Sequence, residues 1–96
     1  MGAMTFFTKA KGRTANEAFR QAIEQAFYDH GHGGYSGSVA EKDRFVPICV
    51  PAGEDPQAFA QRLVDQDDPR IDDKFGPAGA VRLGPEEWLF FGWASS

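Results

Sequence analysis

Residues 14–29 read TANEAFRQAIEQAFYD, and they are the most informative about the fold because no other part of the 96-residue chain is patterned so strongly. Thr14 and Glu17 have the spacing of a capping box, in which the threonine oxygen accepts a backbone hydrogen bond and the glutamate reaches back. Apolar residues then recur at helical spacing; they are Ala15, Ala18, Phe19, Ala22, Ile23, Ala26 and Phe27. We therefore expect a helix over 14–29 with this stripe in the core and Gln21 facing water.

Shorter patterned segments lie on both sides of this helix. Asp55 followed by Pro56 is typical of a helix start and predicts a second helix ending near residue 66. Alternating apolar and polar residues bounded by turn residues predict strands, over 5–10, 36–42, 44–50, 78–83 and 87–94. Pro47 cannot donate a hydrogen bond to a sheet ladder, so the segment that contains it should be an edge strand or carry a bulge.

The resulting order, β-α-β-β-α-β-β, predicts a single α+β domain over residues 5–96. Because hairpin connections dominate, we expect a mostly antiparallel sheet with both helices on one face. The first six elements match a ferredoxin-like or related two-layer sandwich. Residues 1–4 are expected to be a disordered N-terminus.

The charge of the chain is modest and unevenly distributed. Its net charge is −4, and residues 45–96 carry four Lys or Arg against nine Asp or Glu. Neither half holds the dense basic stripe that nucleic-acid binding needs, so a nucleic-acid partner is not expected. The acidic residues gather between positions 65 and 73, where they are typical of a solvated loop with turn chemistry.

Hydropathy and cysteine usage bear on whether the chain is inserted in a membrane, secreted or kept in a reducing compartment. No run of 18 apolar residues is present, so no membrane-spanning segment is expected. The sequence shows no charged start followed by an apolar stretch and a cleavage site, so no secretory signal is expected. The lone Cys49 has no partner for an internal disulfide, which fits a reducing cytoplasm.

A glycine-rich stretch, residues 30–38, follows the first helix and reads HGHGGYSGS. Its four glycines indicate unusual backbone angles or a close approach to another group, and successive backbone N–H groups there could hold an anion. A basic turn nearby could add positive charge for a nucleotide. The candidate ligand-binding residues are His30, His32, Gly33, Gly34, Tyr35, Ser36, Gly37, Ser38, Lys42 and Arg44. The competing interpretation is a purely structural connection.

Known chemical signatures do not fit this stretch. Ser36 stands where a dinucleotide fingerprint needs its third glycine, and the stretch closes a helix instead of opening one. His30 and His32 are two possible metal ligands without an evident third or fourth. A serine or Cys49 beside a histidine has the residue types for nucleophilic catalysis, but nothing in the spacing places them together. No metal, cofactor or catalytic residue is therefore expected.

The last strand-like run, residues 87–94, is apolar on both of its faces. Its large aromatic residues are Trp88, Phe90, Phe91 and Trp93. A sheet covered on one side should bury only one face. Either the rest of the chain covers the second face, or these aromatic residues form an interface with a partner or a second copy.

Three segments, residues 31–42, 73–83 and 88–94, together resemble small uncharacterised proteins of bacteriophages and bacterial mobile elements. The resemblance covers about half of the chain and brings no catalytic or binding residue with it. It implies a small accessory protein acting in the host cytoplasm, often by binding something. From the residues themselves we expect a non-enzymatic module that recognises a protein partner or itself, with small-anion binding or a minor enzymatic role at residues 30–38 as the alternative.

Overall fold

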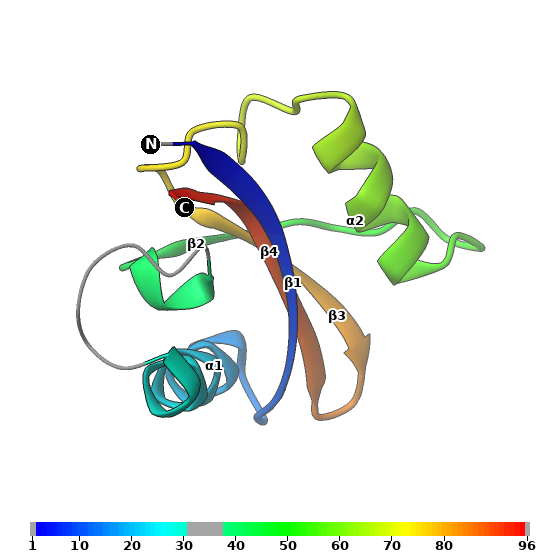
Figure 1. The fold of residues 1–96 in the computed structure, drawn as a ribbon. Helices are drawn as coiled ribbons and strands as arrows, with labels where there is room; N and C mark the ends of the chain where they lie inside the picture. Colours follow the sequence, from blue (N-terminus) through cyan, green and yellow to red (C-terminus); the bar gives the residue numbers. More distant parts are fainter. Residues whose placement is uncertain (1, 31–37, 96) are drawn as a thin grey trace.

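The structure, a computed structural model, describes residues 2–30 and 38–95. Their elements are β1 (Ala3–Lys11), α1 (Ala15–His30), the 3-10 turn η1 (Val39–Glu41), β2 (Phe45–Pro47), α2 (Pro56–Asp65), β3 (Ala78–Gly84) and β4 (Glu87–Ser95). They form a single α+β domain, which confirms the predicted class (Figure 1).

The four described strands form one mixed sheet in the order β1-β4-β3-β2. β4 pairs antiparallel with both β1 and β3, whereas β2 runs parallel to β3. The expectation of a mostly antiparallel sheet is confirmed, and a ferredoxin-like arrangement is not. The first strand of the chain thus lies at one edge of the sheet, and the short β2 lies at the other.

The two helices lie on opposite faces of the sheet, so the expectation of both helices on one face was wrong (Figure 1). The reason is visible in β4, whose successive residues point to opposite faces. Phe90 belongs to the hydrophobic cluster under α1, whereas Leu89 and Phe91 belong to the cluster under α2. Because both faces of β4 are apolar, each needs its own cover.

Aromatic residues form the centre of the cluster under α1. Phe19 of α1 is 9% exposed, and its ring centroid lies 5.2 Å from that of Phe90 and 5.0 Å from that of Phe45. Ile23 is partly buried against this cluster. The predicted inward face of the first helix is therefore confirmed at its centre.

Both helix starts follow the expected local chemistry. Thr14 Oγ1 accepts a hydrogen bond from the Glu17 N–H at 3.2 Å, and the Glu17 carboxylate accepts one from the Arg13 N–H at 3.0 Å. In α2 the carboxylate of Asp55 accepts a hydrogen bond from the Ala58 N–H at 2.9 Å. These caps satisfy backbone donors that have no partner inside a helix.

The region between the helices differs from the sequence expectation. Residues 39–41 form η1, so no strand is found over the described part of 36–42, and residues 36–37 lie outside the described residues. The strand expected over 44–50 is only β2, with Pro47 at its end and at the sheet edge as expected. A short alternating pattern does not distinguish a strand from a 3-10 turn followed by extended chain.

The N-terminal expectation also needs correction. β1 begins at Ala3, and Ala3 and Met4 pair with Ser95 and Ala94 of β4. Residues 3 and 4 therefore belong to the sheet. Their place in the sheet follows from pairing with the end of β4, which lies at the far end of the sequence.

Candidate functional site

The outer edge of β1 carries backbone groups that face away from the sheet. Residues of an antiparallel pair exchange hydrogen bonds at alternate positions. The Gly12 N–H donates to the Glu86 carbonyl at 3.0 Å in the register of the β1–β4 ladder, so the even-numbered residues of β1 bond to β4. The backbone N–H and C=O groups of the odd-numbered residues must therefore point away from β4, towards the free edge. Lys11 agrees with this, since its N–H donates to the Gln21 side chain at 2.6 Å.

The N–H and C=O groups of Thr5, Phe7 and Lys9 consequently form an open row of donors and acceptors. No described residue forms a hydrogen bond with them. The strand contains no proline, and its register with β4 is continuous from Ala3 to Lys11. An edge of this kind is a template for pairing with another extended chain.

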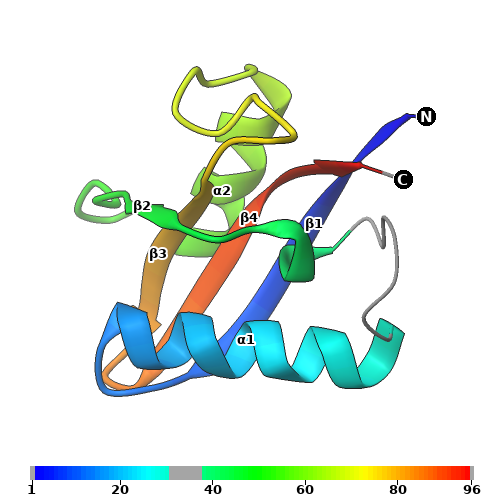
Figure 2. The same ribbon diagram turned by 90° about the vertical axis from the view of Figure 1, so that its left-hand side faces the viewer.

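A groove of about 310 Å³ lies between this edge and α1. It is lined by Thr8, Lys9, Ala10, Lys11, Gln21, Ala22, Gln25 and Glu87. Ala10 and Ala22 are buried, with relative exposures of 7% and 2%, whereas Gln21 and Gln25 are exposed. The groove therefore offers small apolar side chains beside amide groups. α1 crosses the strands near the end of the sheet where β1 finishes (Figure 2).

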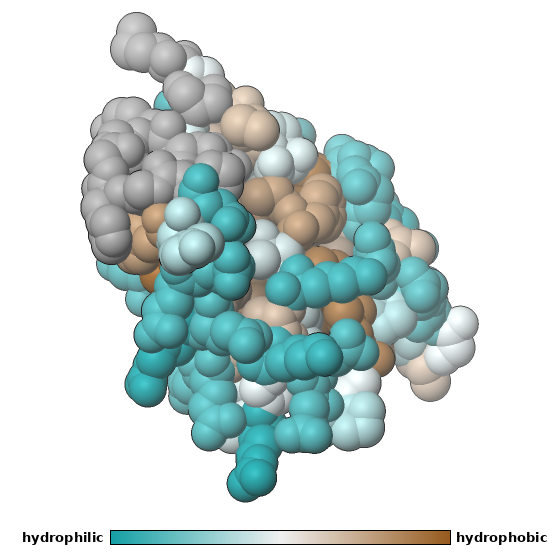
Figure 3. Space-filling view, turned by 60° about the horizontal axis from the view of Figure 1, so that its bottom comes forward, coloured by the Kyte–Doolittle hydropathy of each residue, from teal (hydrophilic) through white to brown (hydrophobic). Residues whose placement is uncertain are grey.

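Two lysines, Lys9 and Lys11, lie at the C-terminal end of β1, beside the groove. Among the described residues, no carboxylate lies within 4.0 Å of the ammonium group of Lys9 or Lys11. Hydrophilic residues cover most of this end of the molecule, with apolar surface showing between them (Figure 3). The open edge therefore has positive charge that the described residues do not pair.

The opposite edge of the sheet, formed by β2, does not offer a comparable row of free backbone groups. β2 has only three residues and ends at Pro47, which lacks an N–H. Just beyond it, the Ile48 N–H donates to the Ala80 carbonyl of the neighbouring strand at 2.8 Å. Short edges and prolines are devices that prevent strand addition. Among the described residues, the edge of β1 is thus the sheet edge that stays open over a long stretch.

Most of the predicted ligand-binding stretch lies outside the described residues. His32, Gly33, Gly34, Tyr35, Ser36 and Gly37 lie outside the described residues, and for His30 only the backbone at the end of α1 is described. Ser38 caps η1, its hydroxyl oxygen accepting a hydrogen bond from the Ala40 N–H at 3.3 Å. Anion binding by this stretch stays a prediction.

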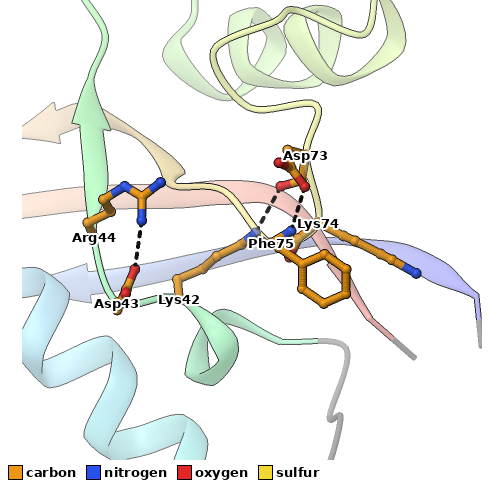
Figure 4. A network of polar contacts seen from close by, with 6 residues as sticks. All are labelled: Lys42, Asp43, Arg44, Asp73, Lys74 and Phe75. Atoms are coloured by element: carbon orange, nitrogen blue, oxygen red, sulfur yellow. Dashed lines mark hydrogen bonds and ion pairs between the residues drawn. The ribbon is translucent and has the colours of Figure 1, made fainter.

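The two basic residues of the candidate ligand site have different surroundings (Figure 4). Lys42 is 4% exposed, and its ammonium group donates to the carbonyl oxygens of Asp73 and Lys74. Arg44 is exposed and its guanidinium lies 3.3 Å from the carboxylate of Asp43. Lys42 is thus used inside the fold, which contradicts a role in holding a free anion.

The aromatic strand is covered from within the chain. Phe90 and Phe91 are both 0% exposed, and Trp88 and Trp93 are partly buried. The Trp88 indole N–H donates to the Gly12 carbonyl at 3.1 Å. Phe90 and Phe91 therefore do not form the partner interface that was considered for them, because one helix packs over each face of β4.

Residues 2–30 and 38–95 contain no group of three or more metal-ligating side chains, and no helix in them is long and apolar enough to cross a membrane.

The acidic residues after α2 make local contacts, as expected for a loop. Asp68 accepts hydrogen bonds from the backbone N–H and the guanidinium of Arg70, and Asp73 accepts one from the Phe75 N–H at 2.8 Å.

Sequence reasoning did not single out the edge of β1, because a strand's place in the sheet depends on which other strands pair with it. The one local signal is the alternation of Lys9 and Lys11 at the end of the strand-like run. The fold and this edge define a small α+β domain with one open strand. The chain matches no protein-family model, no curated protein and no solved structure.

Proposed function

We propose that this protein is a non-enzymatic binding module that takes up an extended segment of a protein partner as an additional strand beside β1. The observation that carries the proposal is the open row of backbone groups at Thr5, Phe7 and Lys9. In strand addition, main-chain hydrogen bonds supply affinity, and alternate side chains of the added strand supply specificity.

The groove beside α1 supports the same function. Side chains of an added strand alternate between the two faces of the sheet. Those on the α1 face would meet Ala10 and Ala22 between the amides of Gln21 and Gln25. The groove volume of about 310 Å³ is at the lower end of the range typical of ligand sites, enough for one or two side chains.

The setting that we propose is the cytoplasm of a bacterial host, as the resemblance to small phage and mobile-element proteins implies. The single Cys49 is free and exposed, which favours a reducing compartment. The proposal uses no catalytic step, in keeping with a sequence whose residue spacing does not indicate a nucleophile beside a base and an orienting group.

Selection from a displayed library of random peptides, followed by amide hydrogen exchange, tests this function. In the free protein the amides of Thr5, Phe7 and Lys9 should exchange fast, whereas those of Phe6 and Thr8, which bond to β4, should exchange slowly. A bound peptide should protect the three outward amides. Selected peptides that leave these amides fast, or a selection that yields no binder, would refute strand addition.

A matched pair of variants isolates the backbone contribution. Thr5→Pro removes one outward N–H without removing a β1–β4 hydrogen bond, so the protein should stay folded while peptide binding weakens. Thr5→Val has nearly the same shape as threonine and keeps the N–H, so its peptide binding should equal that of the unaltered protein. Equal binding by both variants would contradict the proposal.

A further inference from the structure

We infer that the segment added beside β1 is acidic at alternate positions, a conclusion that rests on the proposed function and specifies its partner. Lys9 and Lys11 are two residues apart, so their side chains leave the strand on the same face. Residues of an added strand opposite them would point to that face as well. Carboxylates at every second position of the segment would therefore meet the two ammonium groups.

The carboxylates already near this end of the sheet do not neutralise these lysines. Glu87 lies opposite Lys11 in the β1–β4 register, but no ion pair within 4.0 Å joins them. Glu86 lies 4.0 Å from the Arg13 guanidinium, and Glu17 accepts the Arg13 N–H. Glu17 and Glu86 thus contact Arg13, and Glu87 makes no ion pair with Lys11 within 4.0 Å, so both ammonium groups lack an ion pair with a described carboxylate.

The residue between two such acids would point to the other face, into the groove lined by Ala10, Ala22 and the glutamine amides. Small apolar side chains on the wall of a groove favour an aliphatic occupant, since its burial removes apolar surface from water. The inferred pattern is acidic, aliphatic, acidic in an extended conformation.

Charge also decides against a second copy of this chain as the occupant. β1 reads AMTFFTKAK and holds two lysines and no carboxylate. Two copies paired through β1 would bring four lysines to one sheet without a compensating acid on either strand. Lysines on an edge strand are a known protection against self-pairing, and here they favour an acidic partner over an identical one.

Three synthetic peptides of equal length test the inference: alternating glutamate and valine, alternating glutamine and valine, and alternating lysine and valine. Binding is measured by fluorescence anisotropy, and strand addition is monitored by amide exchange at Thr5, Phe7 and Lys9. The glutamate peptide should bind about fivefold tighter than the glutamine peptide, as expected for two opposite-charge cross-strand pairs. The lysine peptide should bind most weakly, and added salt should reduce the difference.

Variants then assign the preference to the two lysines. Lys9→Gln with Lys11→Gln should abolish the difference between the glutamate and glutamine peptides, whereas Lys9→Arg with Lys11→Arg should keep it. Lys74 is the control, because its ammonium group donates to the Gly2 carbonyl just before the start of β1. Lys74→Gln should leave the difference between the two peptides unchanged.

The outcomes separate the inference from the function on which it rests. Equal binding of the glutamate and glutamine peptides, with protection of the outward amides by both, would overturn the acidic preference and leave strand addition standing. No protection by any peptide would overturn both. Protection that appears without peptide as the protein concentration rises would identify a second copy as the occupant and overturn the inference.

Discussion

The ammonium nitrogen of Lys42 lies 3.0 Å from the carbonyl oxygen of Lys74, 32 residues further along the chain, and 3.3 Å from that of Asp73 (Figure 4). One lysine, 4% exposed, thereby joins the end of η1 to the loop that precedes β3. Backbone carbonyls that are half-buried need a donor, and this side chain supplies it to two of them.

Replacing Lys42 by methionine should lower the free energy of unfolding by about 1–3 kcal/mol, because two hydrogen bonds from a charged donor are lost. Urea denaturation measures the change. Arg44→Met is the matched control: its guanidinium is exposed and pairs with the neighbouring Asp43, so the change should stay within about 0.5 kcal/mol. Equal effects of the two substitutions would contradict a structural role for Lys42.

Stability should also depend on pH through this lysine. Burial lowers the pKa of the Lys42 ammonium below its ordinary value of 10.5, and the charges of Glu41 and Asp73 oppose this only in part. Between the folded and unfolded pKa values the unfolded chain binds more protons, so the free energy of unfolding rises with pH in that window. The gain is complete above 10.5 and is lost as pH falls through the folded pKa.

Denaturation of the unaltered protein and of Lys42→Met, from neutral pH to about 10.5, measures this contribution. Other groups titrate in both proteins and cancel in the difference. The advantage of the unaltered protein should grow towards alkaline pH. A constant or shrinking difference would show that the pKa of Lys42 is not lowered in the fold.

Gly79 of β3 is required by close packing. A Cβ atom at this position would lie 2.6 Å from the Phe91 ring and 3.0 Å from the Ile71 side chain, both almost fully buried. Gly79→Ala should therefore lower the free energy of unfolding by about 1–3 kcal/mol through overpacking. Gly84→Ala is the control, because the nearest atom to its Cβ would be 3.8 Å away. Chemical denaturation with no difference between the two variants would show that the core around Phe91 has room.

Asp67 is held in a left-handed conformation, with φ of 51°, at the C-terminal end of α2. Its N–H donates to the Val64 carbonyl, and the Asp68 N–H donates to the Leu63 carbonyl, which is the Schellman pattern. Glycine adopts this conformation without strain, so Asp67→Gly should raise the free energy of unfolding by about 0.5–1 kcal/mol.

Thermal unfolding checks this prediction, with Asp72→Gly as the control. Asp72 does not have positive φ, so glycine there should only increase the entropy of the unfolded chain and lower the stability slightly. A fall in stability for both variants would mean that the carboxylate of Asp67 matters more than its backbone conformation.

Two residues of α1 should differ in their contribution to stability. Phe19→Ala removes a ring packed against Phe45 and Phe90 and should cost about 3–5 kcal/mol. Gln21 is exposed, as expected, but its amide oxygen accepts the Lys11 N–H, so Gln21→Ala should cost about 0.5–1.5 kcal/mol. Denaturation midpoints compare the two variants, and equal midpoints would mean that α1 is not packed as described.

The candidate site was less accessible to sequence reasoning than the fold. The glycine-rich stretch has an unusual composition that predicts a ligand site, and residues 31–37 of it lie outside the described residues. A lysine at a turn is normally exposed, so the sequence predicts Lys42 as a ligand-binding residue. Nothing local indicates that this side chain meets carbonyls 31 and 32 residues away. The edge of β1 follows only from the strand order.

α1, α2, β3 and β4 could be predicted from the sequence, because their caps, apolar periodicity and turn residues are local signals. That β1 lies at the edge and that one helix covers each face of the sheet could be learned only from the folded structure. The alternation in β4 shows that both of its faces are apolar, but not which helix packs on which face. That choice depends on contacts between residues far apart in the chain, and the same contacts leave the backbone groups of Thr5, Phe7 and Lys9 open.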